Sequence, residues 1–353
     1  MENNTARAGI NQFIGRTVMQ KVVLAALAIA TAASALMLGG CSCGFNCNND
    51  NNGTTSLTLG FSDALPEELK QVVIEVDSIT LTRSNGDDVV VDEFTIPQLG
   101  LVSVDTFQVD LLQYQGRNQL VIVEGLEFPA GTYNQVRVAV LTGDINNSYV
   151  EDANDTLREL TVPNSVLTVS GTNFARSDQV YTIEFGLAQS LRSLANGTRY
   201  ELNNTGIRLE NNATAASLSG RVDSSLFDTV SPCDEKEDPT AGNRIYLYDG
   251  RPSSNERLGD VFTSASSNVV PDNVVPPVAV ASLVFNSLTA TWEYVFGFLP
   301  AGEYTMAFAC NTAADDSVNW DDLIVPQPDD QTYNILLTEN ESGTCDITES
   351  GSC

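Results

Sequence analysis

The sequence predicts an all-β protein with two antiparallel β-sandwich domains, which follow an N-terminal apolar segment and a flexible polar tether. Three observations lead to this fold class. Many segments of five to twelve residues alternate apolar and polar side chains, as half-buried strands do. Gly, Pro, Asn and Asp separate these segments, and only residues 187–195 have a helical spacing. Because each sheet has an apolar face to cover, so many short strands require a second sheet in each domain.

The first domain is expected over residues 56–212. Its strands are rich in Val, Ile, Leu and Thr, which fit a pleated and half-buried surface. The expected strands are 56–61, 71–83, 89–94, 118–124, 132–141, 166–171, 179–186 and 198–209.

The second domain is expected over residues 215–353, after the polar joint at 210–216. Its loops are rich in Pro, Asn, Asp and Ser. The phrase FPAGTYNQVRV at 128–138 returns as LPAGEYTMAFA at 299–309, which indicates one turn used twice. The expected strands are 217–222, 243–249, 280–286, 290–299, 303–309 and 332–338.

Composition restricts the function. The 353 residues are 42% hydrophobic, which is enough for two cores, and the net charge is −29. Such a surface repels nucleic acid and anionic lipid headgroups, so nucleic acid is excluded as a partner. The chain has no histidine, which removes the commonest general base and every histidine-ligated metal. We therefore expect no enzyme activity and no cofactor.

The N-terminal segment has the order of an export signal. Lys21 precedes the apolar run 22–38, and small residues follow it. Leu38-Gly39-Gly40-Cys41 resembles the lipobox of bacterial lipoproteins, which implies cleavage after residue 40 and acylation of Cys41. The alternative is an uncleaved signal anchor, and translation starts at either Met1 or Met19. Because Ser42 follows the cysteine and no aspartate does, the resemblance implies a protein anchored in the outer membrane of the cell envelope.

Residues 41–55 form the lipidated cysteine and an Asn-rich tether. Six further cysteines remain, and an exported chain with an even number of them is expected to form disulfides. Proximity and domain membership favour Cys233 with Cys310, and Cys345 with Cys353. Cys43 and Cys47 alternatively form a metal site.

Residues 56–209 resemble a family of bacterial lipoproteins catalogued as domain of unknown function 4382. The shared landmarks are 62-SDA-64, 72-VVIEVDSITLTR-83, 109-VDLLQYQ-115, 128-FPAGTYNQVRV-138, 160-LTVPNS-165 and 182-TIEFGLAQSL-191. The sequence departs from the family at 202–209, where a Lys-Pro pair is expected. The resemblance implies an exported β-domain and no activity.

Residues 217–338 resemble prealbumin-like or starch-binding-like modules, which have a carbohydrate-binding-like fold. Ser219-Gly220-Arg221-Val222, 244-RIYLYD-249 and 296-FGFLPAGEYTMAF-308 carry this second resemblance, and residues 250–279 depart from it by their length. Such modules are usually non-catalytic, and some of them bind carbohydrate.

Aromatic side chains supply one candidate site. Tyr246 and Tyr248 face away from Ile245 and Leu247 on a strand, so they and Trp320 are candidates for stacking on a sugar. Trp292, Tyr294, Phe296 and Phe298 also share a face, and we interpret this second set as core.

The loop 144-DINNSYVEDAND-155 supplies a candidate calcium site. Asp144, Asn146, Ser148, Asp152 and Asp155 occupy positions 1, 3, 5, 9 and 12 of a calcium loop, although Tyr149 stands where the turn needs Gly. A second acidic cluster is 315-DDSVNWDD-322. Solvated loops are the interpretation that we favour for both.

The sequence therefore predicts a lipid-anchored, non-catalytic protein of the cell envelope. Its β-sandwiches are expected to bind a partner, either carbohydrate or another envelope protein. A structural spacer without a small ligand and a carboxylate-dependent glycan hydrolase are the alternatives.

Overall fold

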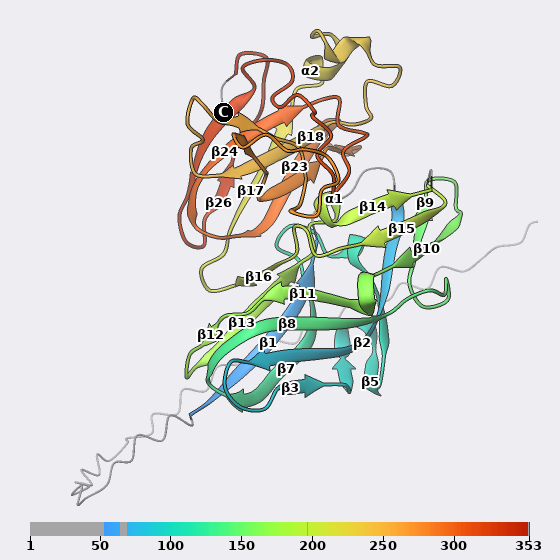
Figure 1. Cartoon of the computed structure of the whole chain (residues 1–353), viewed down its shortest axis with the longest axis vertical. Coiled ribbons are helices and arrows are strands. Elements are labelled where there is room, and N and C mark those ends of the chain that lie inside the picture. The colour runs from blue at the N-terminus through green and yellow to red at the C-terminus, as the bar shows by residue number, and fades with distance from the viewer. Residues whose placement is uncertain (1–52, 64–68, 196, 352) are drawn as a thin grey trace, which may run out of the picture. The chain divides into compact units, whose positions relative to one another are not determined.

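The computed structural model describes residues 53–63, 69–195, 197–351 and 353 (Figure 1). The signal segment, Cys41, Cys43 and Cys47 lie outside these residues. The regular structure of the described chain is mainly strand, in several mostly antiparallel sheets, which confirms the predicted fold class. None of its helices is both long enough and apolar enough to cross a membrane.

The first half contains two principal sheets. The smaller one has the order β16 (Arg208–Asn211), β13 (Asp178–Glu184), β1 (Thr54–Ser62), β7 (Leu120–Pro129). The ten-stranded one runs β11 (Val166–Ser170), β8 (Gly131–Leu141), β2 (Leu69–Arg83), β9 (Tyr149–Asp152), β10 (Leu157–Thr161), β15 (Arg199–Leu202), β14 (Leu191–Leu194), with β12 (Asn173–Phe174), β3 (Val89–Val91) and β6 (Phe107–Asp110) paired to β8 or β2. A separate hairpin joins β4 (Phe94–Ile96) to β5 (Leu101–Val104), and 3₁₀ turns occupy Pro97–Leu99, Leu111–Gln113 and Pro163–Ser165.

Alternating side chains build the core of this half. In β2, the side chains of Val72, Ile74 and Val76 are buried, and those of Ile79 and Leu81 are buried in the same core further along the strand. The change from even to odd positions follows from a bulge between Val76 and Ser78, where one extra residue enters the pairing with β8.

The second half is a smaller sandwich. One sheet has the order β22 (Val284–Asn286), β23 (Thr291–Leu299), β17 (Ala216–Val222), β26 (Ser342–Thr344), and the other β21 (Ala279–Ser282), β18 (Arg244–Asp249), β24 (Gly302–Ala309), β25 (Thr332–Leu337). The short elements are β19 (Arg257–Leu258), β20 (Val274–Val275), α2 (Ser225–Asp228) and the 3₁₀ turn Cys233–Glu235. The pairs β1–β13, β10–β15, β17–β26 and β19–β20 are parallel.

The repeated phrase forms the same turn in both halves. The Tyr133 hydroxyl donates to the Pro129 carbonyl at 2.9 Å, and the Tyr304 hydroxyl donates to the Pro300 carbonyl at 2.7 Å. Each bond ties the start of β8 or β24 back to the preceding turn. The two disulfides that the sequence predicts, Cys233–Cys310 and Cys345–Cys353, are also present.

Several predicted elements differ from the structure. The expected helix 187–195 is a single turn, α1 (Leu187–Ser190), followed by β14. The run 198–209 divides into β15 and β16, because Gly206 has a positive φ of 73° and turns the chain between them. The run 280–286 divides into β21 and β22, which belong to different sheets.

Three family landmarks meet at one end of β1. The Ser62 hydroxyl donates to the carbonyls of Tyr114 and Gly116, and the Asp63 carboxylate accepts the Leu187 backbone N–H. Polar side chains nearby also connect the two halves: Arg192 pairs with Asp316 at 2.7 Å.

Residues 50–353 form one compact unit, although each half has its own hydrophobic core. The division into domains at 56–212 and 215–353 stays a prediction.

Candidate ligand-binding groove

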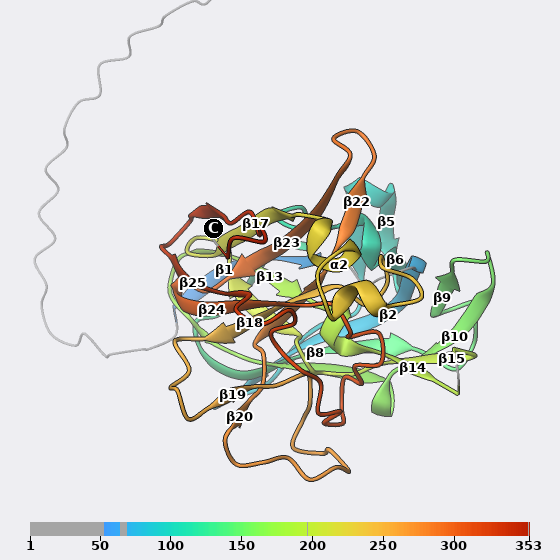
Figure 2. The same ribbon diagram turned by 90° about the horizontal axis from the view of Figure 1, so that it is seen from above.

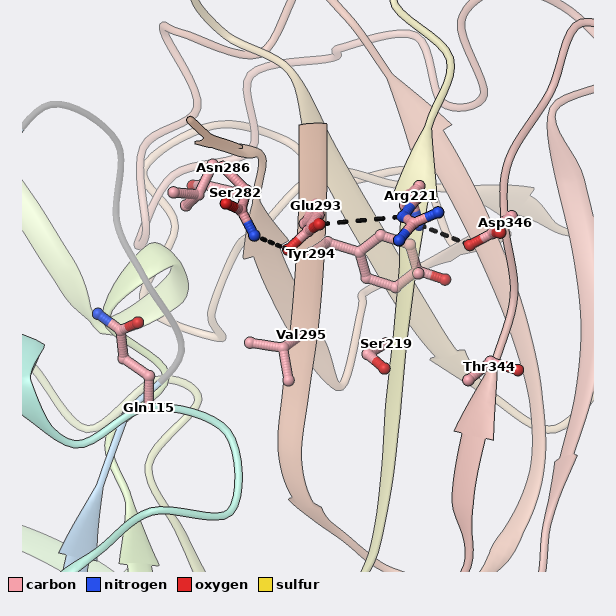
Figure 3. Close-up of a pocket in the computed structure, with 12 residues that line it drawn as sticks. Gln115, Ser219, Arg221, Ser282, Asn286, Glu293, Tyr294, Val295, Thr344 and Asp346 are labelled. Carbon is pink, nitrogen blue, oxygen red and sulfur yellow. Dashed lines mark hydrogen bonds and ion pairs between the residues drawn. The ribbon is translucent and has the colours of Figure 1, made fainter. Parts of the chain in front are cut away.

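A groove of about 690 Å³ lies on the outer face of the sheet β22-β23-β17-β26 (Figure 3). This size lies within the range of small-molecule sites in proteins. Its lining surface is about equally polar and apolar. The lining residues are Gln115, Ser219, Gly220, Arg221, Ser282, Val284, Asn286, Glu293, Tyr294, Val295, Thr344 and Asp346.

Strand register arranges these residues in two rows. Val284 is opposite Glu293, and Glu293 is opposite Arg221, so these three side chains share the outer face. The backbone N–H of Arg221 donates to the Asp346 carboxylate at 2.9 Å, which extends this first row.

The second row is uncharged. Ser219 is opposite Val295 on one side and is the register partner of Thr344 on the other. The intervening Leu218 of β17 points into the core beneath, and Tyr294 of β23 is buried in the same core where it borders the groove.

Hydrogen bonds hold Glu293 in place. Its carboxylate accepts from the Asn286 amide at 3.0 Å and from the Thr291 hydroxyl at 2.7 Å. These bonds keep the pKa of Glu293 below its ordinary value, so the carboxylate is charged at neutral pH. The Arg221 guanidinium lies 3.9 Å from it, and the Arg221 side chain is 57% exposed. Arg221 therefore has a fixed counter-ion and an open face.

A loop of the first half closes one end of the groove. Gln115 lines it, and Gly116 packs against β23 beside Val295. A Cβ at position 297 would lie 2.1 Å from the Gly116 carbonyl oxygen, so only Gly297 allows this approach. The Gln115 amide donates to the Leu112 carbonyl at 2.6 Å, which holds it at this end of the groove.

The groove is equipped to bind an uncharged polar molecule. Arg221 and Gln115 donate hydrogen bonds, Asp346 accepts them, and the hydroxyls of Ser219 and Thr344 do both. The carboxylates of Glu293 and Asp346 balance the positive charge of the Arg221 guanidinium, so the groove has no excess charge to attract a strongly charged ligand. Val284 and Val295 provide apolar contact between the polar groups. The Ser282 hydroxyl, 2% exposed, lies beneath the groove and has no hydrogen-bond partner among the described residues.

The aromatic residues expected to stack on sugar are buried. Tyr246 and Tyr248 have no exposed surface, and Trp320 is 5% exposed. The Tyr246 hydroxyl donates to Asp315 at 2.6 Å, and the Tyr248 hydroxyl donates to the Gly259 carbonyl at 2.6 Å. Their burial leaves no ring face open for stacking.

A third hydrophobic cluster explains this burial. Val261, Val280 and Val325 join Tyr246 and Tyr248 on the face of β18 that the sequence pattern assigns to solvent. The Arg257 guanidinium and the Phe262 ring cover Trp320, at 5.3 Å and 5.5 Å from it.

The second aromatic set is in the core, as we interpreted it. Tyr294 and Phe296 are buried there, and Trp292 packs against it. Phe298 leaves this face, because a bulge between Ala216 and Leu218 in the pairing with β23 brings Leu299 into its place.

The predicted calcium loop contains strand β9, and its carboxylates have protein partners. Asp144 accepts the Asn146 backbone N–H, Asp152 pairs with Arg158 at 3.0 Å, and Asp155 pairs with Lys70. The Ser148 hydroxyl donates to the Leu141 carbonyl. Across the described ranges, no three Cys, Asp or Glu side chains are grouped so that they could hold a metal ion.

The second acidic cluster is structural in this arrangement. The Asp260 carboxylate accepts the backbone N–H groups of Asp321 and Leu323, and Asp315 accepts that of Val261. Burial raises the pKa of Asp260 to about 7 and that of Asp315 to about 6.

Sequence reasoning missed the groove. Its charged residues come from three distant segments, at Arg221, Glu293 and Asp346, and only strand register brings them together. The one available signal was polar alternation in 217-SLSGRV-222 and 291-TWEYV-295, which marks Ser219, Arg221 and Glu293 as one outer face.

A family model matches most of the first half. Residues 54–203 match the family described as domain of unknown function DUF4382, which confirms the resemblance seen in the sequence. The match ends where the sequence departs from the family pattern. No curated protein matches the chain.

Solved structures give low similarity. A candidate adhesin of Bacteroides ovatus has 11% identity and a TM-score of 0.16, with 89% of this chain and 99% of that chain covered. A candidate cell adhesion protein of Bacteroides fragilis has 10% identity and a TM-score of 0.21, with coverages of 85% and 94%. The minor pilin of Streptococcus agalactiae has 12% identity and a TM-score of 0.16, with coverages of 84% and 94%.

Proposed function

With residues 54–203 assigned to the DUF4382 family, we propose that this chain is a lipid-anchored, non-catalytic envelope protein that binds a glycan in the groove. The lipobox-like sequence ending at Cys41 supports the anchor, and Ser42 favours the outer membrane. The anchored chain presents the groove to molecules outside the membrane.

The observation that carries the binding proposal is the row Glu293, Arg221, Asp346 beside the hydroxyls of Ser219 and Thr344. A sugar hydroxyl donates one hydrogen bond and accepts others, so it fits best between a carboxylate and a guanidinium or amide. Neighbouring hydroxyls on a sugar ring repeat this pattern, as the row does. Because the polar groups of the groove are already fixed by strand register, binding a glycan orders few side chains.

The test is a glycan array, followed by titration calorimetry on the best ligand. Arg221→Ala is expected to weaken binding about tenfold or more, since a hydrogen bond to a charged group contributes about 1.5–3 kcal/mol. Arg251→Ala is the matched control, because Arg251 is 58% exposed and lies 3.7 Å from Glu303, outside the groove. This control is expected to bind normally.

Three results would contradict the proposal. If Arg221→Ala left glycan binding unchanged, the groove would not be the binding site. A chain that binds no glycan at all would favour the structural spacer. Hydrolysis of a bound glycan, lost on a single Asp→Asn change, would favour the hydrolase.

A further inference from the structure

The hairpin of β22 and β23 carries an unusual exposed apolar tip. Leu288 in its turn is 96% exposed, Phe285 is 49% exposed and Val284 is 39% exposed. Figure 2 shows this hairpin extending beyond the neighbouring strands. Leu288 in particular is almost fully exposed, and Phe285 keeps about half of its surface exposed.

The same segment is uncharged. No Asp, Glu, Lys or Arg occurs between Asp272 and Glu293, although 18% of the whole chain is charged and its net charge is −29. Anionic headgroups repel the acidic surface elsewhere. Apart from Glu293, whose carboxylate is held by side chains of the hairpin, this segment therefore adds no charge that a membrane surface would repel.

The polar groups at the tip are satisfied within the hairpin. The Glu293 carboxylate accepts from the side chains of Asn286, Thr289 and Thr291, and the Asn286 side-chain amide oxygen Oδ1 accepts the Leu288 backbone N–H. Burying a polar group costs free energy only where it loses its hydrogen bonds. A surface that recognises a protein keeps free hydrogen-bond donors and acceptors for its partner. The polar side chains at this tip already bond to one another.

An aromatic pair supports the apolar tip. The Phe285 ring packs 5.3 Å from Trp292, which is itself half-buried. Trp and Tyr, whose rings combine an apolar body with a polar group, are enriched at the membrane interface.

We propose that the tip around Leu288 and Phe285 inserts into the interface of the bilayer that holds the lipid on Cys41. This inference rests on the proposed lipid anchor. Residues 42–52 join Cys41 to the described chain and span at most about 40 Å. The anchor keeps the hairpin at a high effective concentration near the bilayer, so a few apolar side chains suffice for contact.

The contact can be measured with the native acylated protein in vesicles of brominated phosphatidylcholine, which quench nearby tryptophan. The chain has two tryptophans, and Trp320 is buried outside the hairpin. Quenching is expected in the wild type, is expected to disappear in Trp292→Phe, and is expected to persist in Trp320→Phe. Leu288→Asp is expected to reduce it several-fold.

Val269→Asp is the matched control, because Val269 is 91% exposed in a loop outside the hairpin. It introduces the same charge and is expected to leave the quenching unchanged. Near-ultraviolet circular dichroism checks that each variant is folded.

Vesicle flotation separates the two proposals. Protein that floats with the vesicles but shows no quenching of Trp292 would overturn the hairpin contact and leave the anchor standing. Protein that fails to float would overturn both. Loss of binding to an envelope protein on Leu288→Asp, without a change in quenching, would assign the tip to a protein partner and overturn the bilayer contact.

Discussion

At the scale of single residues, the alternation along β18 correctly assigns Tyr246 to the face opposite Ile245. Tyr246 is nevertheless a buried residue in the structure and not an exposed platform for a sugar. Alternation along β18 places Tyr246 opposite to Ile245, and the structure agrees. The second face is nevertheless buried, because residues of the 258–275 and 311–325 loops cover it. The sequence pattern contains no information about loops that fold back from far along the chain.

Tyr246→Ala should therefore destabilise the fold instead of removing a binding surface. The substitution empties a fully buried site and leaves Asp315 without its 2.6 Å donor, so a loss of about 3–5 kcal/mol in the free energy of unfolding is expected. Urea unfolding measures this loss. Tyr246→Phe keeps the ring and should lose only about 1–3 kcal/mol. A Tyr246→Ala protein as stable as the wild type, with weaker glycan binding, would restore the stacking role.

At the scale of elements, the strands with clear alternation were predictable and their pairing was not. β1, β2, β8, β17 and β24 lie where the apolar periodicity places them. β9 and β26 were missed, because their few residues resemble polar loops. The groove could not be predicted either, because its two rows of side chains exist only through the pairing of β17, β23 and β26.

Buried carboxyls in these elements give the stability a defined pH dependence. Burial raises the pKa of Glu184 and of Asp260 to about 7 and that of Asp315 to about 6, against 4.5 for a free Glu and 3.8 for a free Asp. Between about pH 4 and 7 the folded chain holds protons that the unfolded chain has released. The free energy of unfolding is therefore expected to fall as the pH rises through this window.

Urea unfolding at pH 4.5 and pH 7.5 measures the difference. Asp260→Asn cannot ionise, so the fall between the two pH values should be smaller in this variant. Stability that rises with pH across the window would contradict the burial of these groups in ionisable form.

At the scale of the whole molecule, the two halves act together at the groove. The Gly116 loop of the first half packs on β23 of the second, and the Arg117 guanidinium donates to the Ala215 carbonyl at 3.1 Å. The family landmark 109-VDLLQYQ-115 thus ends in a residue that lines the groove. The sequence indicated both halves, but their junction depends on contacts between residues that are about a hundred or more positions apart.

The central claim is that this chain is held at a membrane by lipid on Cys41. Cys41→Ser is expected to release the protein into the soluble fraction of lysed cells, because stable anchoring requires more than one acyl chain and this variant has none.

Intact-mass spectrometry of the native protein, purified from membranes, tests the claim most directly. We expect a chain that begins at Cys41 and carries a diacylglyceryl group and an amide-linked acyl chain. An unacylated chain that retains residues 19–40 would contradict it.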